Sequence, residues 1–459
     1  MDTLGESKAA SGAPSADPEE TGRDPEGEPV ALPRHGLASI APLRHRNYAL
    51  LWSGGLVSII GTWMQTVAVG ALVIAHTGKA TWAVVIAAGA FLPIGLLSPV
   101  GGALADRIPR RAALVTGNLL AAVCAAILAA MVAAGDKSPA ALTLVVTIQG
   151  CIAALTLPFQ QAILPDLVPR TEFLAAVSLN SAQYNLGRVI GPAAAGAAVA
   201  AFGYPVAFVA NAVSFLAVVL ALAFVRLPPP SGAHEGGGLF ASLRLGVDQS
   251  RREPGCRAAI RTIAIVGLLA SPFIALIPAV ANHLTAGGAR TIASATALLT
   301  TAQGAGAVLG ALVIPQLATR ITRGRVLAGS LVLLPPALAL YGVAPTLWWA
   351  VLALFGVGFV YIGVLSGMST VVQLRAPTAY RGRILSFYLV ALGVSYPIGA
   401  LMQGPLVDQF GLAWTICGAA VLLSLILGAI RMVRPAAIQV LFESVPPEVH
   451  TEAKTLPAT

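Results

Sequence analysis

Charged residues are scarce in this chain of 459 residues. Asp, Glu, Lys and Arg together make up 10% of it, whereas 57% is hydrophobic and the mean hydropathy is +0.82. A soluble chain of this length needs far more polar surface to cover its domains. The composition therefore argues against a soluble protein and predicts one that lies in a membrane.

The sequence also lacks the usual signatures of catalysis and metal binding. It contains no Walker loop, zincin helix or nucleophile elbow. Its cysteines show no metal-ligand or redox spacing and are interpreted as small apolar residues: Cys124, Cys151, Cys256 and Cys417. We therefore expect a protein that is not an enzyme, has no cofactor or metal and does not use ATP.

Basic residues exceed acidic ones and give a net charge of +9, but they are scattered between apolar runs. This pattern favours a membrane surface over nucleic acid as the partner. Most Lys and Arg residues fall on one side of the predicted helices, and the exceptions are Lys79, Lys137, Arg188 and Arg290. Because cytoplasmic loops retain positive charge, we expect both termini in the cytoplasm and an even number of helices in the cell membrane.

Long apolar runs are abundant in this sequence. Six runs long enough to cross about 30 Å of hydrocarbon fall within residues 48–225, and six more fall within 258–430. Pro169 and Pro377, like Gly191 and Gly399, are related by one spacing of 208 residues, which indicates a duplication. The expected fold is an all-α membrane protein with 12 transmembrane helices in two pseudo-symmetric six-helix bundles.

The expected domain organisation has five parts. Residues 1–42, rich in Glu, Asp, Pro, Gly and Ser, are predicted to form a disordered cytoplasmic tail. Residues 43–225 form the N-terminal six-helix bundle, and 258–434 form the C-terminal one. Residues 226–257 are a cytoplasmic linker with an amphipathic helix. Residues 435–459 are a second cytoplasmic tail.

One loop carries a family resemblance. Gly102-Ala-Leu-Ala-Asp-Arg-Ile-Pro-Arg-Arg111 resembles the loop between helices two and three of the major facilitator superfamily, although Pro109 stands where Gly is usual. The resemblance implies the major facilitator fold, with Asp106 bracing the N-terminal end of helix eleven. The segment would latch the cytoplasmic gate, or its arginines would only fix topology. The gating candidates are Gly102, Asp106, Arg107, Arg110 and Arg111.

A second motif lies in predicted helix five. Gly187-Arg-Val-Ile-Gly-Pro-Ala-Ala-Ala-Gly196 resembles the Gly-x-x-x-Gly-Pro-x-x-Gly-Gly pattern of drug antiporters in this superfamily. Small residues let helices approach closely, and a proline bends the helix. Helix eight is predicted to supply a matching stripe. The helix-packing candidates are Gly187, Gly191, Pro192, Gly196, Gly306 and Gly310, and plain close packing remains an alternative to an antiporter-specific role.

Arg188 lies inside this motif, roughly 24 Å along the helix from Glu172 at 1.5 Å per residue. At mid-bilayer an arginine costs about 2.5 to 3.5 kcal/mol, so it needs water, carbonyl groups or an anion. Polar residues on the same helix face, and two tyrosines in the second half, predict a cavity for an anionic, aromatic or amphiphilic cargo: Asn180, Tyr184, Asn185, Tyr388 and Tyr396. Alternatively, backbone carbonyls hold Arg188 and it touches no substrate.

Other polar residues on the predicted helices are weaker candidates. Gln65, Gln149, Asn282 and Gln303 would bind cargo, or would only join helices by hydrogen bonds. The sequence places no Asp or Glu at mid-depth. Asp408, near the outer edge, would carry a proton or cap a helix end.

Further segments narrow the resemblance to one branch of the superfamily. Leu43-Arg-His-Arg-Asn-Tyr48, Gly61-Thr-Trp-Met-Gln65 and Leu164-Pro-Asp-Leu-Val-Pro169 resemble the enterobactin-exporter and macrolide-efflux branch. The resemblance implies export of a small organic compound, such as a siderophore, antibiotic or drug-like molecule, by alternating access and proton antiport. The expected partners are that substrate, membrane lipid and a proton gradient, and the chain is expected to be monomeric. An importer or uniporter, and a non-transporting receptor or scaffold, are the alternatives.

Overall fold

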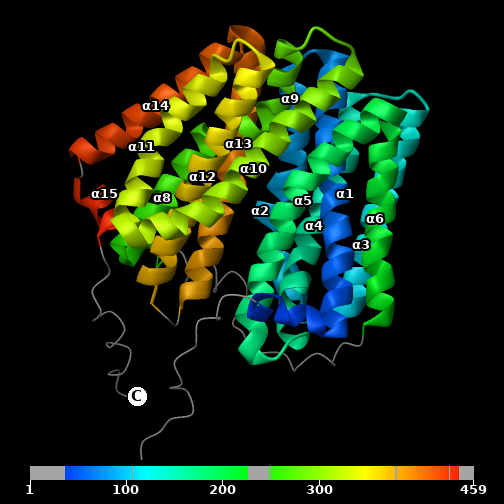
Figure 1. Ribbon diagram of the computed structural model, residues 1–459, viewed down its shortest axis with the longest axis horizontal. Helices are drawn as coiled ribbons and strands as arrows, with labels where there is room; N and C mark the ends of the chain where they lie inside the picture. The colour runs from blue at the N-terminus through cyan, green and yellow to red at the C-terminus, as the bar shows by residue number, and fades with distance from the viewer. Residues whose placement is uncertain are drawn as a thin grey trace, which may run out of the picture.

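The computed structural model describes residues 37–105, 107–225, 248, 250–377, 380–433 and 435–443. Within these ranges the chain forms helices joined by turns, without strands. Figure 1 shows two groups of helices side by side, one from each half of the sequence. This arrangement agrees with the expected all-α membrane fold.

The N-terminal half contains six long helices and three short 3-10 helices. The long helices are α1 (Arg46–Thr77), α2 (Ala80–Ala105), α3 (Arg110–Ala133), α4 (Pro139–Ala162), α5 (Phe173–Phe202) and α6 (Pro205–Phe224). The short ones are η1 (Leu37–Arg44), η2 (Leu164–Asp166) and η3 (Arg170–Glu172).

The C-terminal half repeats this pattern with one helix divided in two. Its helices are α8 (Pro254–Leu269), α9 (Phe273–Leu284), α10 (Ala289–Ile321), α11 (Arg323–Gly342), α12 (Leu347–Arg375), α13 (Arg381–Phe410), α14 (Leu412–Val433) and α15 (Pro435–Phe442).

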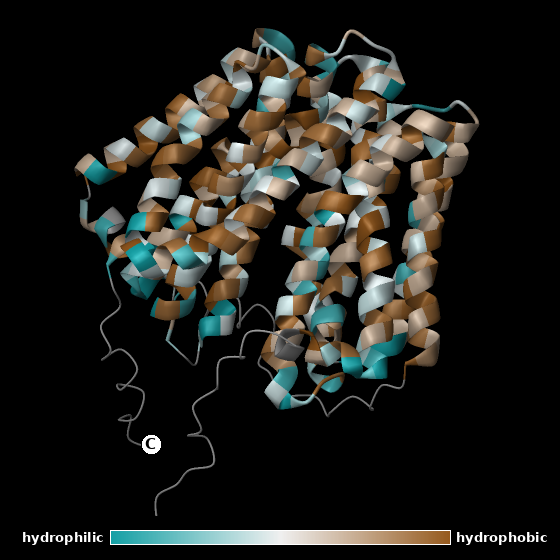
Figure 2. Ribbon diagram, viewed as in Figure 1, coloured by the Kyte–Doolittle hydropathy of each residue, from teal (hydrophilic) through white to brown (hydrophobic). Residues whose placement is uncertain are grey.

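Among the described residues, 11 helical segments are long and apolar enough to cross a membrane, with α8 and α9 together counting as one. Figure 2 shows hydrophobic residues over the middle of the helices and more hydrophilic residues toward their ends. Helix α5 is not among the 11, although it has 30 residues. Its polar side chains, Arg188 among them, lower its hydropathy. The count of 12 membrane helices therefore stays a prediction.

We call the end of the molecule at which α3, α11 and α13 begin the basic end, because each starts with arginines, and the opposite end the far end. Helices α2, α10 and α14 begin at the far end and finish at the basic end. Positions along the helices are described below relative to these two ends. Neither end is assigned to a side of the membrane.

The break between α8 and α9 differs from the single apolar run predicted at residues 258–282. Pro272 lacks an N–H group, and α9 begins directly after it. The Gln403 side chain of α13 donates to the carbonyls of Leu268 and Leu269, at 3.3 and 3.0 Å. The break is stable because a neighbouring helix bonds the carbonyl groups that the helix leaves free.

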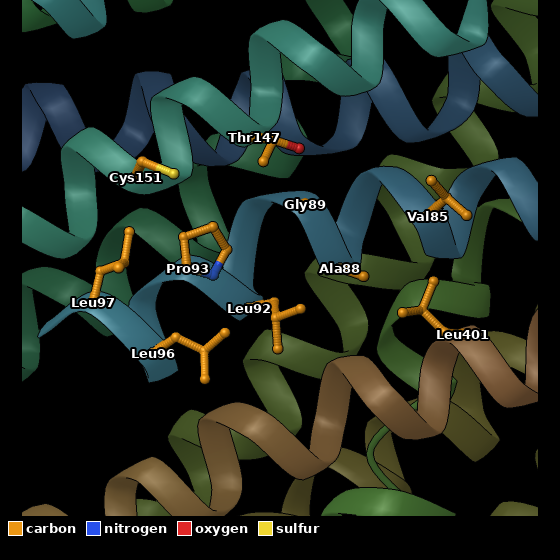
Figure 3. Close-up of a pocket in the computed structure, with 10 residues that line it drawn as sticks. All are labelled: Val85, Ala88, Gly89, Leu92, Pro93, Leu96, Leu97, Thr147, Cys151 and Leu401. Carbon is orange, nitrogen blue, oxygen red and sulfur yellow. The ribbon is translucent and has the colours of Figure 1, made fainter.

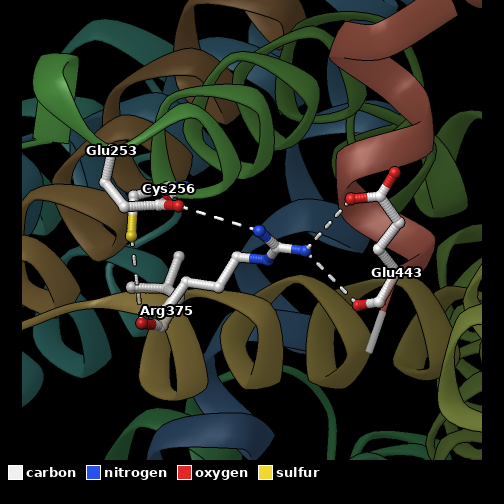
Figure 4. Close-up of polar contacts among 5 residues, drawn as sticks. Glu253, Cys256, Arg375 and Glu443 are labelled. Atoms are coloured by element: carbon white, nitrogen blue, oxygen red, sulfur yellow. Dashed lines mark hydrogen bonds and ion pairs between the residues drawn. The ribbon is translucent and has the colours of Figure 1, made fainter. Parts of the chain in front are cut away.

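Residues 435–442, placed in a tail by the sequence analysis, form helix α15, which packs against α8, α11 and α14 at the basic end. Figure 4 shows how Arg375, the last residue of α12, connects this helix to the start of α8. Its guanidinium lies 3.8 Å from Glu253 and 3.9 Å from Glu443, and it donates to the Glu443 carbonyl at 3.3 Å. Residues 226–247 of the linker, which hold most of the predicted amphipathic helix, lie outside the described residues, as do residues 1–36.

Replacing Arg375 with Gln is expected to lower the stability of the C-terminal half by about 1 kcal/mol, because the neutral side chain forms neither ion pair. The midpoint of thermal unfolding in detergent measures this loss. Arg320→Gln is the matched control, since Arg320 is exposed and has no ion pair or hydrogen bond among the described residues. An equal effect of the two variants would contradict the prediction.

Candidate functional site

Arg188 lies on α5 where the two halves meet, and side chains from both halves hold it. It is 9% exposed. Its Nη2 donates to Gln303 Oε1 on α10 at 2.6 Å. Its guanidinium lies over the Trp63 ring on α1, 5.7 Å from the ring centroid. The contacts to Arg188 are thus side chains on α1 and α10, whereas the alternative stated above was backbone carbonyls.

The Arg188 guanidinium retains donors without partners. Its Nε is buried and has no hydrogen bond among the described residues, and the same holds for Gln303 Nε2. Gln303 itself is 1% exposed. A buried donor without a partner costs about 1 to 3 kcal/mol. The pair is therefore incompletely satisfied, and no carboxylate within the described ranges neutralises the charge of Arg188.

The predicted polar face of α5 is open on the basic side of Arg188. Tyr184 is 48% exposed and meets the Trp63 ring edge to face, with centroids 6.1 Å apart. Asn185 donates to the Ser181 carbonyl of its own helix at 2.8 Å. Asn180 accepts a hydrogen bond from Tyr48 of α1 at 3.1 Å. Among these residues, Tyr184 has the freest side chain beside Arg188.

The two predicted tyrosines of α13 lie in different surroundings. Tyr388 is 3% exposed, and its hydroxyl donates to the Leu365 carbonyl of α12 at 3.0 Å, within the C-terminal half. Tyr396 is also buried and meets Phe91 of α2 edge to face, with centroids 5.6 Å apart. In this structure both tyrosines are thus buried, and the Tyr388 hydroxyl is occupied by a backbone carbonyl, so the predicted cavity wall of two phenols stays a prediction.

Gln65 and Gln149 belong to a hydrogen-bond network inside the N-terminal half. Gln65 donates to Gln149 of α4 and accepts from Asn211 of α6 at 2.8 Å. Gln149 also donates to the Ala121 carbonyl of α3 at 3.4 Å. These contacts match the interhelical alternative for both glutamines. Asn282 is half-buried on α9 and has no hydrogen bond to the described part of the chain.

The glycines of the α5 motif allow close packing against α1. A Cβ atom at Gly187 would lie 2.1 Å from Ile59, and one at Gly191 would lie 2.8 Å from the Ile60 carbonyl oxygen. Pro192 follows Gly191 and is also buried. The absence of a side chain at both glycines therefore brings α5 against α1, which places Arg188 above Trp63.

The two predicted glycine stripes do not face each other. Cβ atoms at Gly306 and Gly310 of α10 would lie 2.0 and 2.8 Å from backbone oxygens of α12. The contact between α5 and α10 uses other glycines. A Cβ at Gly196 would lie 2.7 Å from the Ala297 side chain, and one at Gly304 would lie 3.1 Å from the Arg188 carbonyl oxygen. The expected match fails because Gly187 and Gly191 are already packed on α1.

The loop at the basic end is described in part. Asp106 lies outside the described residues, so the gate latch stays a prediction. Arg110 pairs with Asp166 of η2, and Arg111 donates to the Ala223 carbonyl at the end of α6, at 3.1 Å. Arg107 is exposed, and a Cβ at Gly102 would meet no atom within 4 Å. The contacts of Arg110 and Arg111 lie within the N-terminal half.

The hydrogen bonds between the halves gather toward the far end. Within the described ranges they begin at Arg188 and Gln303 and continue away from the basic end. Tyr204 donates to the Ala289 carbonyl at 2.5 Å, and Arg290 donates to the Ala200 carbonyl at 3.3 Å. Asp408 bonds the start of α2. In Figure 1 the halves meet near α9 at the top, and their lower ends lie apart.

A separate pocket of about 390 Å³ lies between α2 and α4 and is bordered by Leu401 of α13 (Figure 3). Its lining is almost entirely apolar. The Thr147 hydroxyl, one of its few polar groups, donates to the Thr143 carbonyl of its own helix at 2.8 Å. This pocket offers no charged group and differs from the surroundings of Arg188.

The sequence analysis did not select Trp63, although it lies in the quoted segment Gly61–Gln65. For a tryptophan in an apolar helix, the sequence does not show which neighbouring helix its side chain packs against. The signal that identifies it is the contact of Gly187 and Gly191 with α1, which only the packed structure shows.

Gly191→Ala is expected to destabilise the protein by about 1 to 3 kcal/mol, since the added Cβ would lie 2.5 Å from the Trp63 Cβ. Thermal unfolding in detergent tests this. Gly418→Ala on α14 is the control, because a Cβ there meets no atom within 4 Å. If both variants melt like the parent protein, α5 and α1 do not pack as described.

Comparisons with known proteins identify the family. A family model described as "Transmembrane secretion effector" (MFS_3) matches residues 37–451. The chain is 25% identical over 393 residues to the multidrug efflux pump Tap of Mycolicibacterium fortuitum, covering 84% of this chain and 95% of that protein. It is 24% identical to the staphyloferrin A transporter of Staphylococcus aureus, covering 79% and 90%. It is 28% identical to the enterobactin exporter EntS of Citrobacter koseri, covering 85% and 94%.

Solved structures support the fold. A point mutant of the nucleoside transporter NupG superimposes with a TM-score of 0.69 at 15% identity, covering 86% of this chain and all of that one. A bacterial homologue of the iron transporter ferroportin in an inward-facing state gives 0.64 at 17% identity, covering 87% and 99%. The family match spans most of the chain, and the resemblance found in the sequence is confirmed. The protein belongs to the transmembrane secretion effector family of major facilitator superfamily transporters, as a multi-pass membrane protein.

Proposed function

We propose that this protein exports a small organic anion across the cell membrane by alternating access, and that Arg188 binds the anion. The observation that carries this proposal is the buried guanidinium between the two halves, which has no carboxylate partner within the described ranges and keeps an unpaired Nε. A cation in this position is costly unless a ligand or water satisfies it. An anionic cargo would supply the missing charge and hydrogen-bond acceptors.

The proposed orientation rests on the positive-inside rule, by which the basic end lies in the cytoplasm together with both termini and α5 is a twelfth membrane helix. The proposed path of the cargo rests on the contacts between the halves. The hydrogen bonds between the halves lie at and beyond Arg188, toward the far end. In this state the cargo would enter from the cytoplasm and reach Arg188, and it would leave after the far end opens.

The side chains beside Arg188 favour an aromatic or amphiphilic anion. Trp63 already stacks under the guanidinium, and Tyr184 is half exposed next to it. Aromatic rings in this position would contact a planar or apolar part of the cargo while Arg188 binds its charge. Relatives named for drug efflux and for staphyloferrin A and enterobactin transport support a cargo of the siderophore, antibiotic or drug-like type.

Proton antiport is the driving force that we propose, with the protein acting as a monomer. The candidate for its carrier, Asp408, accepts hydrogen bonds from α2 with both carboxylate oxygens in this state. An importer or uniporter would use the same fold. A receptor or scaffold would have no use for an incompletely paired Arg188.

Everted membrane vesicles test the direction and the coupling. We expect them to accumulate the cargo only when a proton gradient is imposed, and to lose it when a protonophore is added. The cargo is first identified by comparing metabolites of cells with and without the protein. Uptake that ignores the proton gradient and stops when the concentrations inside and outside are equal would favour the uniporter, and accumulation only in right-side-out vesicles would favour the importer.

Arg188→Gln is expected to reduce export at least 10-fold, since a hydrogen bond to a charged group contributes about 1.5 to 3 kcal/mol. Arg188→Lys should retain part of the activity, because it keeps the charge. Arg290→Gln is the matched control, as Arg290 also bonds the opposite half but lies at the far end. Export at the parental rate by Arg188→Gln, with normal membrane insertion, would refute the proposed anion site.

A further inference from the structure

Asp408 connects the two halves at the far end through a carboxylate. It lies in the last turn of α13 and faces the first residues of α2. Oδ1 accepts from the Ala80 backbone N–H at 2.7 Å, and Oδ2 accepts from the Thr81 backbone N–H at 3.0 Å. The Thr81 hydroxyl also donates to Oδ2, at 2.5 Å. One side chain of the C-terminal half thus caps a helix of the N-terminal half.

The Asp408 carboxylate accepts hydrogen bonds from N–H groups at the start of α2 that have no partner within that helix. The first N–H groups of a helix have no partner within the helix and carry partial positive charge. A carboxylate there is favourable, and loss of a helix cap typically costs about 1 kcal/mol. Within its own helix the same carboxylate is badly placed, because Asp408 lies two residues before the end of α13, where the helix dipole favours cations. The position is therefore explained by α2, and not by α13.

Close packing beside the cap makes the contact specific. Gly404 lies one turn before Asp408 on α13. A Cβ there would lie 2.3 Å from the Val84 side chain and 3.1 Å from the Thr81 Cα. Further along the same two helices, a Cβ at Gly95 would lie 3.0 Å from the Gly393 carbonyl carbon. Helices α2 and α13 therefore touch directly from the far end to mid-length, with the carboxylate at the outer end of this contact.

No competing charge holds Asp408. The titratable side chains near the far end include the basic or neutral His76, Lys79, Lys137, His283 and Arg290 and the acidic Asp136, and none of them forms an ion pair with Asp408 within the described ranges. Lys79 is exposed, and Arg290 donates instead to the Ala200 carbonyl. The hydrogen bonds to Asp408 thus depend on α2 staying in place, and they are lost when the halves separate at this end.

We propose that Asp408 is the latch of the far gate: its carboxylate holds α2 against α13 while the cavity is open at the basic end, and it releases α2 when cargo leaves. The proposal rests on the proposed function for its cargo and membrane orientation. The structural part of the proposal is that a side chain of one half caps a helix of the other half and so favours one state of the transporter. This part does not depend on the identity of the cargo.

Cysteine accessibility tests the latch without any cargo. The reporter is Ser181→Cys, an exposed position on α5 on the basic side of Arg188, in a background without Cys124, Cys151, Cys256 and Cys417. A membrane-impermeant maleimide is added outside intact cells, where it reaches this cysteine only when the far end opens. Asp408→Ala is expected to raise the labelling rate about 5-fold, corresponding to a lost cap.

Asp136→Ala is the matched control. Asp136 also lies at the far end and accepts from a backbone N–H, that of Ser138 at 2.9 Å, but within the N-terminal half. Its loss should leave the labelling rate unchanged. Equal labelling of Asp408→Ala, Asp136→Ala and the parent protein would overturn the latch.

Two further variants keep the test decisive if Asp408→Ala inserts poorly. Thr81→Val removes one of the three hydrogen bonds and should raise labelling by a smaller factor. The pair Thr81→Cys and Asp408→Cys should form a disulfide that stops both labelling and export until it is reduced. Faster labelling of Asp408→Ala in a protein that exports nothing would support the latch and refute the exporter. Export by a protein whose labelling rate is unchanged in Asp408→Ala would refute the latch and support the exporter.

Discussion

The burial of one guanidinium between two helical bundles is the constraint on which the rest of this structure depends. Arg188 cannot reach bulk water easily from the middle of α5, so neighbouring helices must supply its contacts. Trp63 approaches it because Gly187 and Gly191 allow α1 to pack closely, and Gln303 reaches it from the other half. The Arg188 Nε and the Gln303 Nε2 keep no partner among the described residues, which suits the cargo-binding role that we propose for this guanidinium.

The contacts between the halves are distributed unevenly along the molecule. Glycines bring α5 against α10 and α2 against α13 from the far end to mid-length, and hydrogen bonds follow the same stretch. On the basic side of Arg188, Tyr184 is half exposed, and the lower ends of the two halves lie apart in Figure 1. The N-terminal half is braced internally by Gln65, Gln149 and Asn211. Such bracing favours movement of the N-terminal half as a unit over rearrangement inside it.

Much of the fold could be predicted from the sequence, because the apolar runs, the repeat and the positions of arginine each reflect one strong physical requirement. The family resemblance was carried by short motifs and is confirmed by a match over most of the chain. Arg188 stood out for the same reason, as a charge in an apolar segment. Its partners could not be predicted, since Trp63 and Gln303 become neighbours only through packing of α1 and α10 against α5. The burial of Tyr388 against α12 could not be predicted either, because helical spacing defines a face but not the helix that covers it.

The divided helix formed by α8 and α9 has a mechanical consequence. Its two segments share no continuous ladder of backbone hydrogen bonds, and Gln403 of α13 takes over the carbonyls at the break. A change in the angle between α8 and α9 would therefore break no hydrogen bond inside either helix. Because Gln403 lies on the same helix as Asp408, the break in the chain and the contact at the far end are held by one structural element.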